Sequence, residues 1–206
     1  MSFLNEFFGN LLRIIYGIVG DYSLAIILLT LFVKVALLPL TIKQDKSMKK
    51  MKDIQPEINK LRDQYGSDPK MLNEKTMALY KEYKVNPAAG CLPILLQMPI
   101  LFALFAVLRN PETIPVGSMF FIWDLTAIDP YYVFPLLNGL VIFVQQKMSG
   151  MGDNPQQKNM LYIMPIMMVM FGLKMPVGLL LYWVSSSVFT ILQQEFIIKR
   201  GWVGWK

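Results

Sequence analysis

The stretch YSLAIILLTLFVKVALLPL, residues 22–40, decides the fold class, because it is an apolar run of nineteen residues that carries one charge, Lys34. A helix of that length crosses the roughly 30 Å hydrocarbon core of a bilayer. An ionisable side chain inside such a helix costs about 2.5–3.5 kcal/mol near the membrane centre and marks a functional site by default. Only about 9 Å of helix separates Lys34 from Leu40, so snorkelling of the ammonium to the headgroups stays open as the alternative.

The composition is that of a membrane protein. Hydrophobic residues make up 54% of the chain and charged residues 17%, below the roughly 25% of soluble domains. The mean hydropathy is +0.43. These values exclude a soluble enzyme. Further apolar stretches lie at 91–108, 130–146, 160–173 and 177–192.

The apolar stretches predict an all-α integral membrane protein with five transmembrane helices, an N-terminal interfacial amphipathic helix and a cytoplasmic helical hairpin. The last three stretches are short for a bilayer core, which favours local thinning of the membrane. The expected order, within one membrane domain, is an amphipathic helix at 1–20, transmembrane helices at 21–42, 90–109, 130–147, 159–174 and 176–198, the hairpin at 43–87, an outer loop at 110–129, a cytoplasmic loop at 148–158 and a short cytoplasmic tail at 199–206.

The basic residues predict the orientation, because lysine and arginine accumulate on the cytoplasmic side of short loops. Eleven lie between the first two spans and five more fall on the same side of the membrane. The other side holds only Arg13, Arg109 and Lys174. We therefore expect the N-terminus outside and the C-terminus in the cytoplasm. The net charge of +6 follows from this topology, so specific nucleic-acid recognition is not expected.

The first twenty residues and the basic loop both have helical periodicity. In the first segment, polar residues and Gly9 gather on one side of the helical wheel, which predicts an interfacial amphipathic helix; a cleaved or partly disordered leader is the alternative. In the basic loop, Pro56 suits the first turn of a new helix and residues 65–69 read as a turn, which predicts a helical hairpin.

The polar residues inside the spans cluster toward the cytoplasmic half. With the topology above, Lys34, Gln97, Gln145 and Ser187 come to similar depths from four different helices. Polar groups inside a membrane face a bundle interior or water, so these residues predict one wet cavity that opens inward and does not cross the membrane. For the serines at 185–187, interhelical hydrogen bonding that only holds the bundle together is the alternative.

The residue inventory argues against catalysis. The chain has no histidine and a single cysteine, Cys91, so we expect no metal site, no cofactor and no enzymatic activity. No nucleotide-binding motif is present. One hydrolytic alternative remains, in which Lys34 acts as a base toward Ser186 or Ser187 as nucleophile. An anion channel or small-solute transporter centred on Lys34 is a second alternative, and an inward-only cavity argues against it.

Five segments resemble the YidC insertases of bacteria, relatives of the mitochondrial Oxa and chloroplast Alb proteins. The segments that carry the resemblance are LFVKVALLPLTIKQ (31–44), QPEINKLRDQYG (55–66), NPAAGCLPILLQMPILFALF (86–105), DPYYVFPLLNGLVIFVQQKMS (129–149) and GLLLYWVSSSVFTILQQ (178–194). The resemblance implies a membrane protein insertase and chaperone with a positively charged groove open to cytoplasm and lipid. It places Lys34 at the basic position of that groove and makes Gln97, Gln145 and Trp183 lining residues.

The same resemblance implies nascent membrane proteins as substrates, the cell membrane as location, and the ribosome, a targeting receptor and the Sec translocon as candidate contacts of the cytoplasmic loops. Three departures from the family pattern stand out. Lys34 occupies a position where the family usually has arginine, and lysine loses the planar fork and is more easily deprotonated. The chain also shows no lipobox cysteine and no large outer domain, which is similar to the minimal core of the family, and its tail after Glu195 is short.

Overall fold

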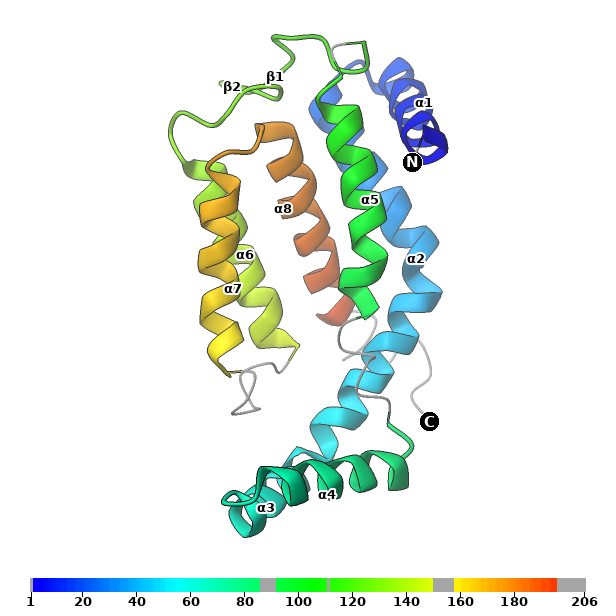
Figure 1. The fold of residues 1–206 in the computed structure, drawn as a ribbon. Helices are drawn as coiled ribbons and strands as arrows, with labels where there is room; N and C mark the ends of the chain where they lie inside the picture. Colours follow the sequence, from blue (N-terminus) through cyan, green and yellow to red (C-terminus); the bar gives the residue numbers. More distant parts are fainter. Residues whose placement is uncertain (1, 86–91, 111, 150–157, 196–206) are drawn as a thin grey trace.

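The computed structural model describes residues 2–85, 92–110, 112–149 and 158–195, and it is predominantly helical in these ranges (Figure 1). The parts of the predicted loops and tail at 86–91, 150–157 and 196–206 lie outside the described residues. Among the described helices, two are long and apolar enough to cross a membrane by length and composition, namely Tyr22–Asp53 and Val177–Glu195. Shorter apolar helices cover Gln97–Leu108, Val133–Met148 and Lys158–Gly172.

The chain begins with helix α1 (Ser2–Val19), which turns at Gly20 into the long helix α2 (Tyr22–Asp53). Gly20 has φ of +73°, a left-handed value that favours glycine. Asp21 then caps α2, because its carboxylate accepts from the backbone N–H of Leu24 at 2.8 Å. Gly9 was expected on the polar side of α1, but it is buried against α5, which shows that this side of α1 is partly covered.

Helix α2 does not end at residue 42, where the first span was expected to stop; it continues to Asp53. The physical reason is that residues 43–53 contain neither glycine nor proline and are mostly lysine, methionine and glutamine, which favour helix. Pro39, inside the helix, does not break it. The apolar run and the basic segment after it therefore belong to one continuous helix (Figure 1).

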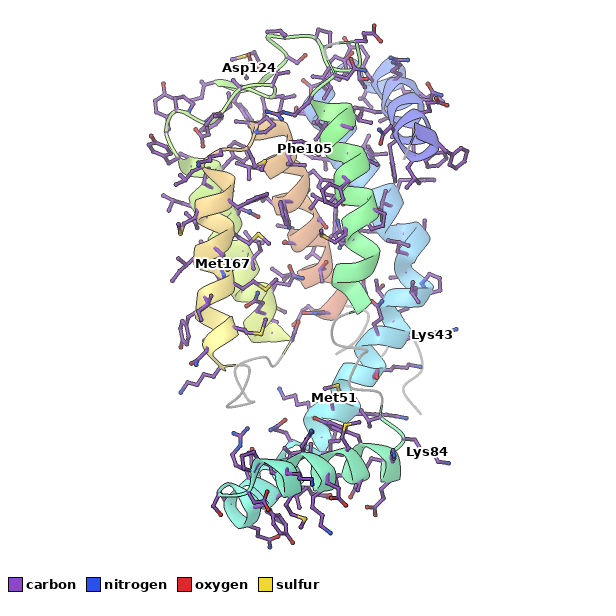
Figure 2. All side chains as sticks on the ribbon, viewed as in Figure 1. Lys43, Met51, Lys84, Phe105, Asp124 and Met167 are labelled. Atoms are coloured by element: carbon purple, nitrogen blue, oxygen red, sulfur yellow. The ribbon has the colours of Figure 1, made fainter. Side chains whose placement is uncertain are left out.

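The hairpin consists of α3 (Gln55–Tyr65) and α4 (Pro69–Glu82), with Pro56 in the first turn of α3. A small apolar cluster of Ile54, Ile58 and Val85 holds its helices together. The carboxylate of Glu57 also accepts a hydrogen bond from the Tyr83 hydroxyl at 2.8 Å, and this bond raises the pKa of Tyr83 above its ordinary value. Lys43 and Lys84 are exposed, and their side chains point away from the helices in Figure 2.

Helix α8 (Val177–Leu192) is the centre of the bundle. It packs against α6 (Val133–Met148) on one side and α2 on the other, and it also touches α5 (Leu92–Leu108). Helix α7 (Lys158–Gly172) packs on α6, and α5 packs on α1. The first six residues of α8, 177–182, are all buried. Large apolar side chains around Met167 on α7 instead project outward (Figure 2).

The outer loop contains a short antiparallel pair that the sequence did not predict, β1 (Met119–Phe120) and β2 (Trp123–Asp124). Just after it, Asp129 is fully buried and its carboxylate accepts three hydrogen bonds, from Trp123 Nε1 at 2.8 Å, Tyr131 N at 2.9 Å and Phe134 N at 2.7 Å. The last of these belongs to the first turn of α6. Asp129 therefore ties the loop between α5 and α6 to the start of α6.

Helices α6 and α7 approach closely at Gly139. A Cβ atom placed on this glycine would collide with Cγ2 of Val169 and lie 3.2 Å from the backbone oxygen of Pro165. Because valine is restricted at χ1, the Val169 side chain cannot easily move away. The small residue is therefore a packing requirement of the α6–α7 pair.

We expect Gly139→Ala to lower the thermal stability of the purified protein in detergent, because overpacking typically costs about 1–3 kcal/mol. Val169→Ala combined with Gly139→Ala should restore part of the loss by removing the colliding methyl groups. Gly17→Ala is the matched control, since a Cβ there has no atom within 4 Å. Equal melting temperatures for Gly139→Ala and Gly17→Ala would contradict the close approach.

Candidate functional site

Three polar residues lie on one face of α8 at four-residue spacing: Tyr182, Ser186 and Thr190. Residues four apart on a helix are neighbours on the same face, so these side chains form a polar stripe about 12 Å long. Tyr182 and Ser186 are buried, and Thr190 is half-buried. We call these three residues the α8 stripe.

The α8 stripe holds Lys34. This lysine lies on α2, is half-buried, and its Nζ donates to Oγ1 of Thr190 at 2.8 Å. The Thr190 hydroxyl in turn donates to the backbone oxygen of Ser186 at 2.9 Å. The ammonium is thus bound to the C-terminal half of α8. The Thr190 hydroxyl donates its proton within the helix, so its oxygen accepts the hydrogen bond from Lys34.

The α8 stripe also holds Gln97. This glutamine lies on α5 and is half-buried, and its Nε2 donates to the hydroxyl of Tyr182. Tyr182 is only 2% exposed, so this hydrogen bond satisfies a polar atom that would otherwise be buried in the core. One face of α8 therefore connects two predicted site residues from two different helices.

The other predicted residues lie elsewhere around α8. Ser187 is buried beside Ser186. Trp183 is half-buried and meets Phe171 of α7 edge-on, with ring centroids 6.5 Å apart. Gln145 is half-buried near the last turn of α6. Trp183 thus lies on the α7 side of α8, while Lys34 and Gln97 meet the α8 stripe.

Two partners in this arrangement were not predicted as site residues, Thr190 and Tyr182. The four-residue spacing of Tyr182, Ser186 and Thr190 is the signal that would have placed them on one face. The neighbouring helix that each of them contacts depends on tertiary packing and cannot be predicted from the sequence pattern.

Two open cavities lie at the other end of the molecule. One, of about 280 Å³, lies between α1 and the end of α5 and includes Arg13 and Thr113 in its lining. The other, of about 310 Å³, is lined by the start of α2 and the outer loop. Neither includes a predicted site residue. Within the described ranges, no group of three or more histidine, cysteine or acidic residues is placed to hold a metal.

The comparisons with known proteins agree with this picture. A family model described as "60Kd inner membrane protein" matches residues 14–202. A relative from Fusobacterium nucleatum, named membrane protein insertase YidC, is 52% identical over 200 residues, covering 97% of this chain and 97% of the relative. The chain belongs to the YidC family.

Other YidC relatives are longer than this chain. A YidC insertase from Syntrophus aciditrophicus is 41% identical over 192 residues, which cover 92% of this chain and 35% of that protein. The solved structure of an active YidC insertase, with its first transmembrane domain resolved, is 27% identical and superposes with a TM-score of 0.77 over 93% of this chain and 46% of that one. The chain therefore spans about a third of the Syntrophus relative and less than half of the solved insertase.

The YidC family membership confirms the resemblance found in the sequence. It also supports the expectation that the chain is not an enzyme, because the relatives are named insertases. The comparisons give no support to a channel or to a Ser-Lys hydrolase. In the structure, the Lys34 ammonium donates to Thr190, which the hydrolase interpretation did not include.

We expect the Gln97–Tyr182 hydrogen bond to contribute measurably to stability. A double-mutant cycle with Gln97→Met and Tyr182→Phe isolates the pair, because both changes keep size and remove one partner each. The expected coupling is about 0.6 kcal/mol, the average for side-chain hydrogen bonds in membrane bundles. It is measured from unfolding free energies in mixed micelles. Strict additivity of the two changes would mean that this bond does not form.

Proposed function

We propose that this chain is a membrane protein insertase whose working element is a hydrophilic, positively charged groove between α2, α5, α6 and α8. The observation that carries the proposal is the half-buried ammonium of Lys34, hydrogen-bonded to Thr190 on α8. A charge that is partly removed from water is a stronger attractor than one at the surface, because the local dielectric constant is lower. Gln97, Gln145, Trp183 and Ser187 complete the proposed lining.

In this proposal α2, α5, α6, α7 and α8 are the five spans, and α1 lies in the outer interface. The large apolar side chains exposed on α6 and α7 support a lipid environment, since soluble proteins rarely expose contiguous apolar patches of this kind. Exposed Phe3 and Ile18 on α1 support an interfacial position. The lysine-rich hairpin then lies in the cytoplasm, with the N-terminus outside and the C-terminus inside.

The first step of insertion, as we propose it, is entry of the substrate's hydrophilic outer segment into the groove from the cytoplasm. Acidic side chains on that segment are attracted most. At 4 Å and an effective dielectric constant of about 20, the Coulomb attraction to Lys34 is about 4 kcal/mol before desolvation is subtracted. The groove also shortens the apolar barrier that the segment crosses.

The second step is partition of the substrate's hydrophobic helix into lipid along α6 and α8. Both helices expose apolar residues beside the proposed groove, Leu140 and Val144 on α6 and Val188 and Leu192 on α8. Burial of apolar surface releases roughly 25 cal/mol per Å², so a hydrophobic helix supplies the driving force without ATP.

The cytoplasmic partners we propose are the nascent membrane protein together with the ribosome, a targeting receptor or the Sec translocon. The hairpin supports this assignment, because α3 and α4 form a compact unit that carries several exposed basic side chains, including Lys60, Lys70 and Lys81. A basic surface suits acidic or nucleic-acid-containing assemblies through long-range attraction.

We expect Lys34→Ala to slow insertion of a single-span substrate with a short acidic N-terminal tail by about tenfold or more in proteoliposomes. A net attraction of about 1.4 kcal/mol corresponds to that factor. Lys34→Arg should retain activity, because it keeps the charge. Thr190→Val should give an intermediate loss, since it keeps the size and removes the hydroxyl that positions the ammonium.

The matched control is a substrate whose tail is basic instead of acidic, for which Lys34→Ala should change the rate far less. Equal rates for the wild type, Lys34→Ala and Lys34→Arg with the acidic tail would show that Lys34 only snorkels. A requirement for nucleotide hydrolysis by the purified protein would contradict the proposed driving force.

A further inference from the structure

Uncharged amide side chains gather at the cytoplasmic end of the bundle, beyond Lys34. Together with two hydroxyl side chains they form a group that we call the glutamine collar. Its members are Thr41 and Gln44 of α2, Gln146 of α6 with Ser149 directly after this helix, and Gln193 and Gln194 directly after α8. Thr41 and Gln44 are three residues apart, as are Gln146 and Ser149, so each pair lies on one face of its helix.

Two hydrogen bonds close the glutamine collar. Nε2 of Gln193 donates to Oγ1 of Thr41 at 3.0 Å, and Nε2 of Gln194 donates to Oγ of Ser149 at 2.9 Å. Successive residues of a helix point about 100° apart, which lets these neighbours reach α2 and α6 on opposite sides of α8. The backbone at 193–195 forms a π-type turn, a feature common at functional sites.

Three buried amide atoms of the glutamine collar have no hydrogen-bond partner: Nε2 of Gln44, Oε1 of Gln146 and Oε1 of Gln194. Gln44 is 5% exposed and Gln146 is 8% exposed. An unpaired buried polar atom costs more than one neutral hydrogen bond contributes, and hydrogen bonds inside membrane bundles are weak. The hydrogen-bonding capacity of the glutamine collar is therefore incompletely used. A ligand that supplies the missing hydrogen-bond partners would gain free energy by binding there.

The chemistry of the unpaired atoms specifies the ligand. They comprise one donor and two acceptors, all uncharged, so the complementary group offers both N–H and C=O without a charge. The peptide main chain does this at every residue and independently of sequence. An entering polypeptide segment also passes this level, because Gln44 lies ten residues, about 15 Å, to the cytoplasmic side of Lys34 along α2.

We infer that the glutamine collar is a binding site for the main chain of an extended, hydrophilic polypeptide segment. The main-chain N–H groups donate to Oε1 of Gln146 and Gln194, and Nε2 of Gln44 donates to a main-chain carbonyl. The inference rests on the proposed insertase function and adds a second, sequence-independent contact to the charge of Lys34. Segments without acidic residues are held by this contact alone.

The test uses the full chain in proteoliposomes of phosphatidylethanolamine and phosphatidylglycerol. The probe is a synthetic single-span peptide with an uncharged tail of either glycine and serine or sarcosine and serine. Sarcosine is N-methylglycine, so it removes the main-chain N–H and keeps the carbonyl. Tail translocation is measured as protection from protease, with the rate in protein-free liposomes subtracted for each peptide.

We expect Gln146→Met to slow the glycine tail three- to tenfold and the sarcosine tail less than twofold. Methionine keeps the length and helix propensity of glutamine and removes the amide. The melting temperature should stay equal or rise, because an unpaired polar atom has been removed. Asn138→Leu is the matched control: Asn138 is 1% exposed and both its amide atoms are unpaired, but it lies eight residues, about 12 Å, before Gln146 along α6.

Equal slowing of both tails, or no slowing of either, would overturn the inference, and so would a fall in melting temperature that accounts for the lost rate. A similar tail-dependent effect of Asn138→Leu would also overturn it. Lys34→Ala with the acidic-tailed substrate is run in parallel. If Lys34→Ala loses insertion of the acidic-tailed substrate but Gln146→Met affects the glycine and sarcosine tails equally, only the inference about the glutamine collar is refuted. If the wild type inserts neither substrate, the proposed function is refuted.

Discussion

The arrangement of the bundle depends on one constraint, which is that the ammonium of Lys34 needs polar partners inside an apolar helix. Helix α8 meets this need with the hydroxyl of Thr190, and the same α8 stripe satisfies Gln97 through Tyr182. The first half of α8 is apolar and buried, so it positions the polar second half between α2 and α6. Packing of the first half of α8 thus holds the polar groups of its second half in place.

The two ends of the bundle differ in how their polar groups are satisfied. Near the start of α6 and α8, the buried carboxylate of Asp129 accepts three hydrogen bonds, and Gly178 donates its backbone N–H to the Leu125 oxygen at 2.8 Å. At the opposite end, the glutamine collar keeps unpaired amide atoms. Asn138, in the first half of α6, is also buried with both amide atoms unpaired, so unpaired polar atoms are not confined to the collar.

Much of this structure could be predicted from the sequence, because hydropathy and helix punctuation are local signals. Pro56 and the turn at 65–69 were interpreted correctly. Lys34 and Gln97 have polar partners on α8, and their role as site residues stays a prediction. The basic segment from residue 43 was predicted to be helical, but its continuity with the apolar helix as far as Asp53 was missed, because the fall in hydropathy was interpreted as the end of an element. Thr190 and Tyr182 were missed as partners because interhelical pairing depends on packing, and the β1–β2 pair is too short to show periodicity.

The central claim is that the α8 stripe borders a cavity that opens to the cytoplasm and is closed to the outside. Its most direct test is the accessibility of Thr190→Cys, a half-buried position of the α8 stripe, in a Cys91→Ala background to a membrane-impermeant methanethiosulfonate added from one side at a time. Asn138→Cys, a fully buried position in the first half of α6, serves as the comparison. Modification of Thr190→Cys only from the cytoplasmic side is the expected result. Modification from the outer side, or from neither side, would contradict an inward-open groove.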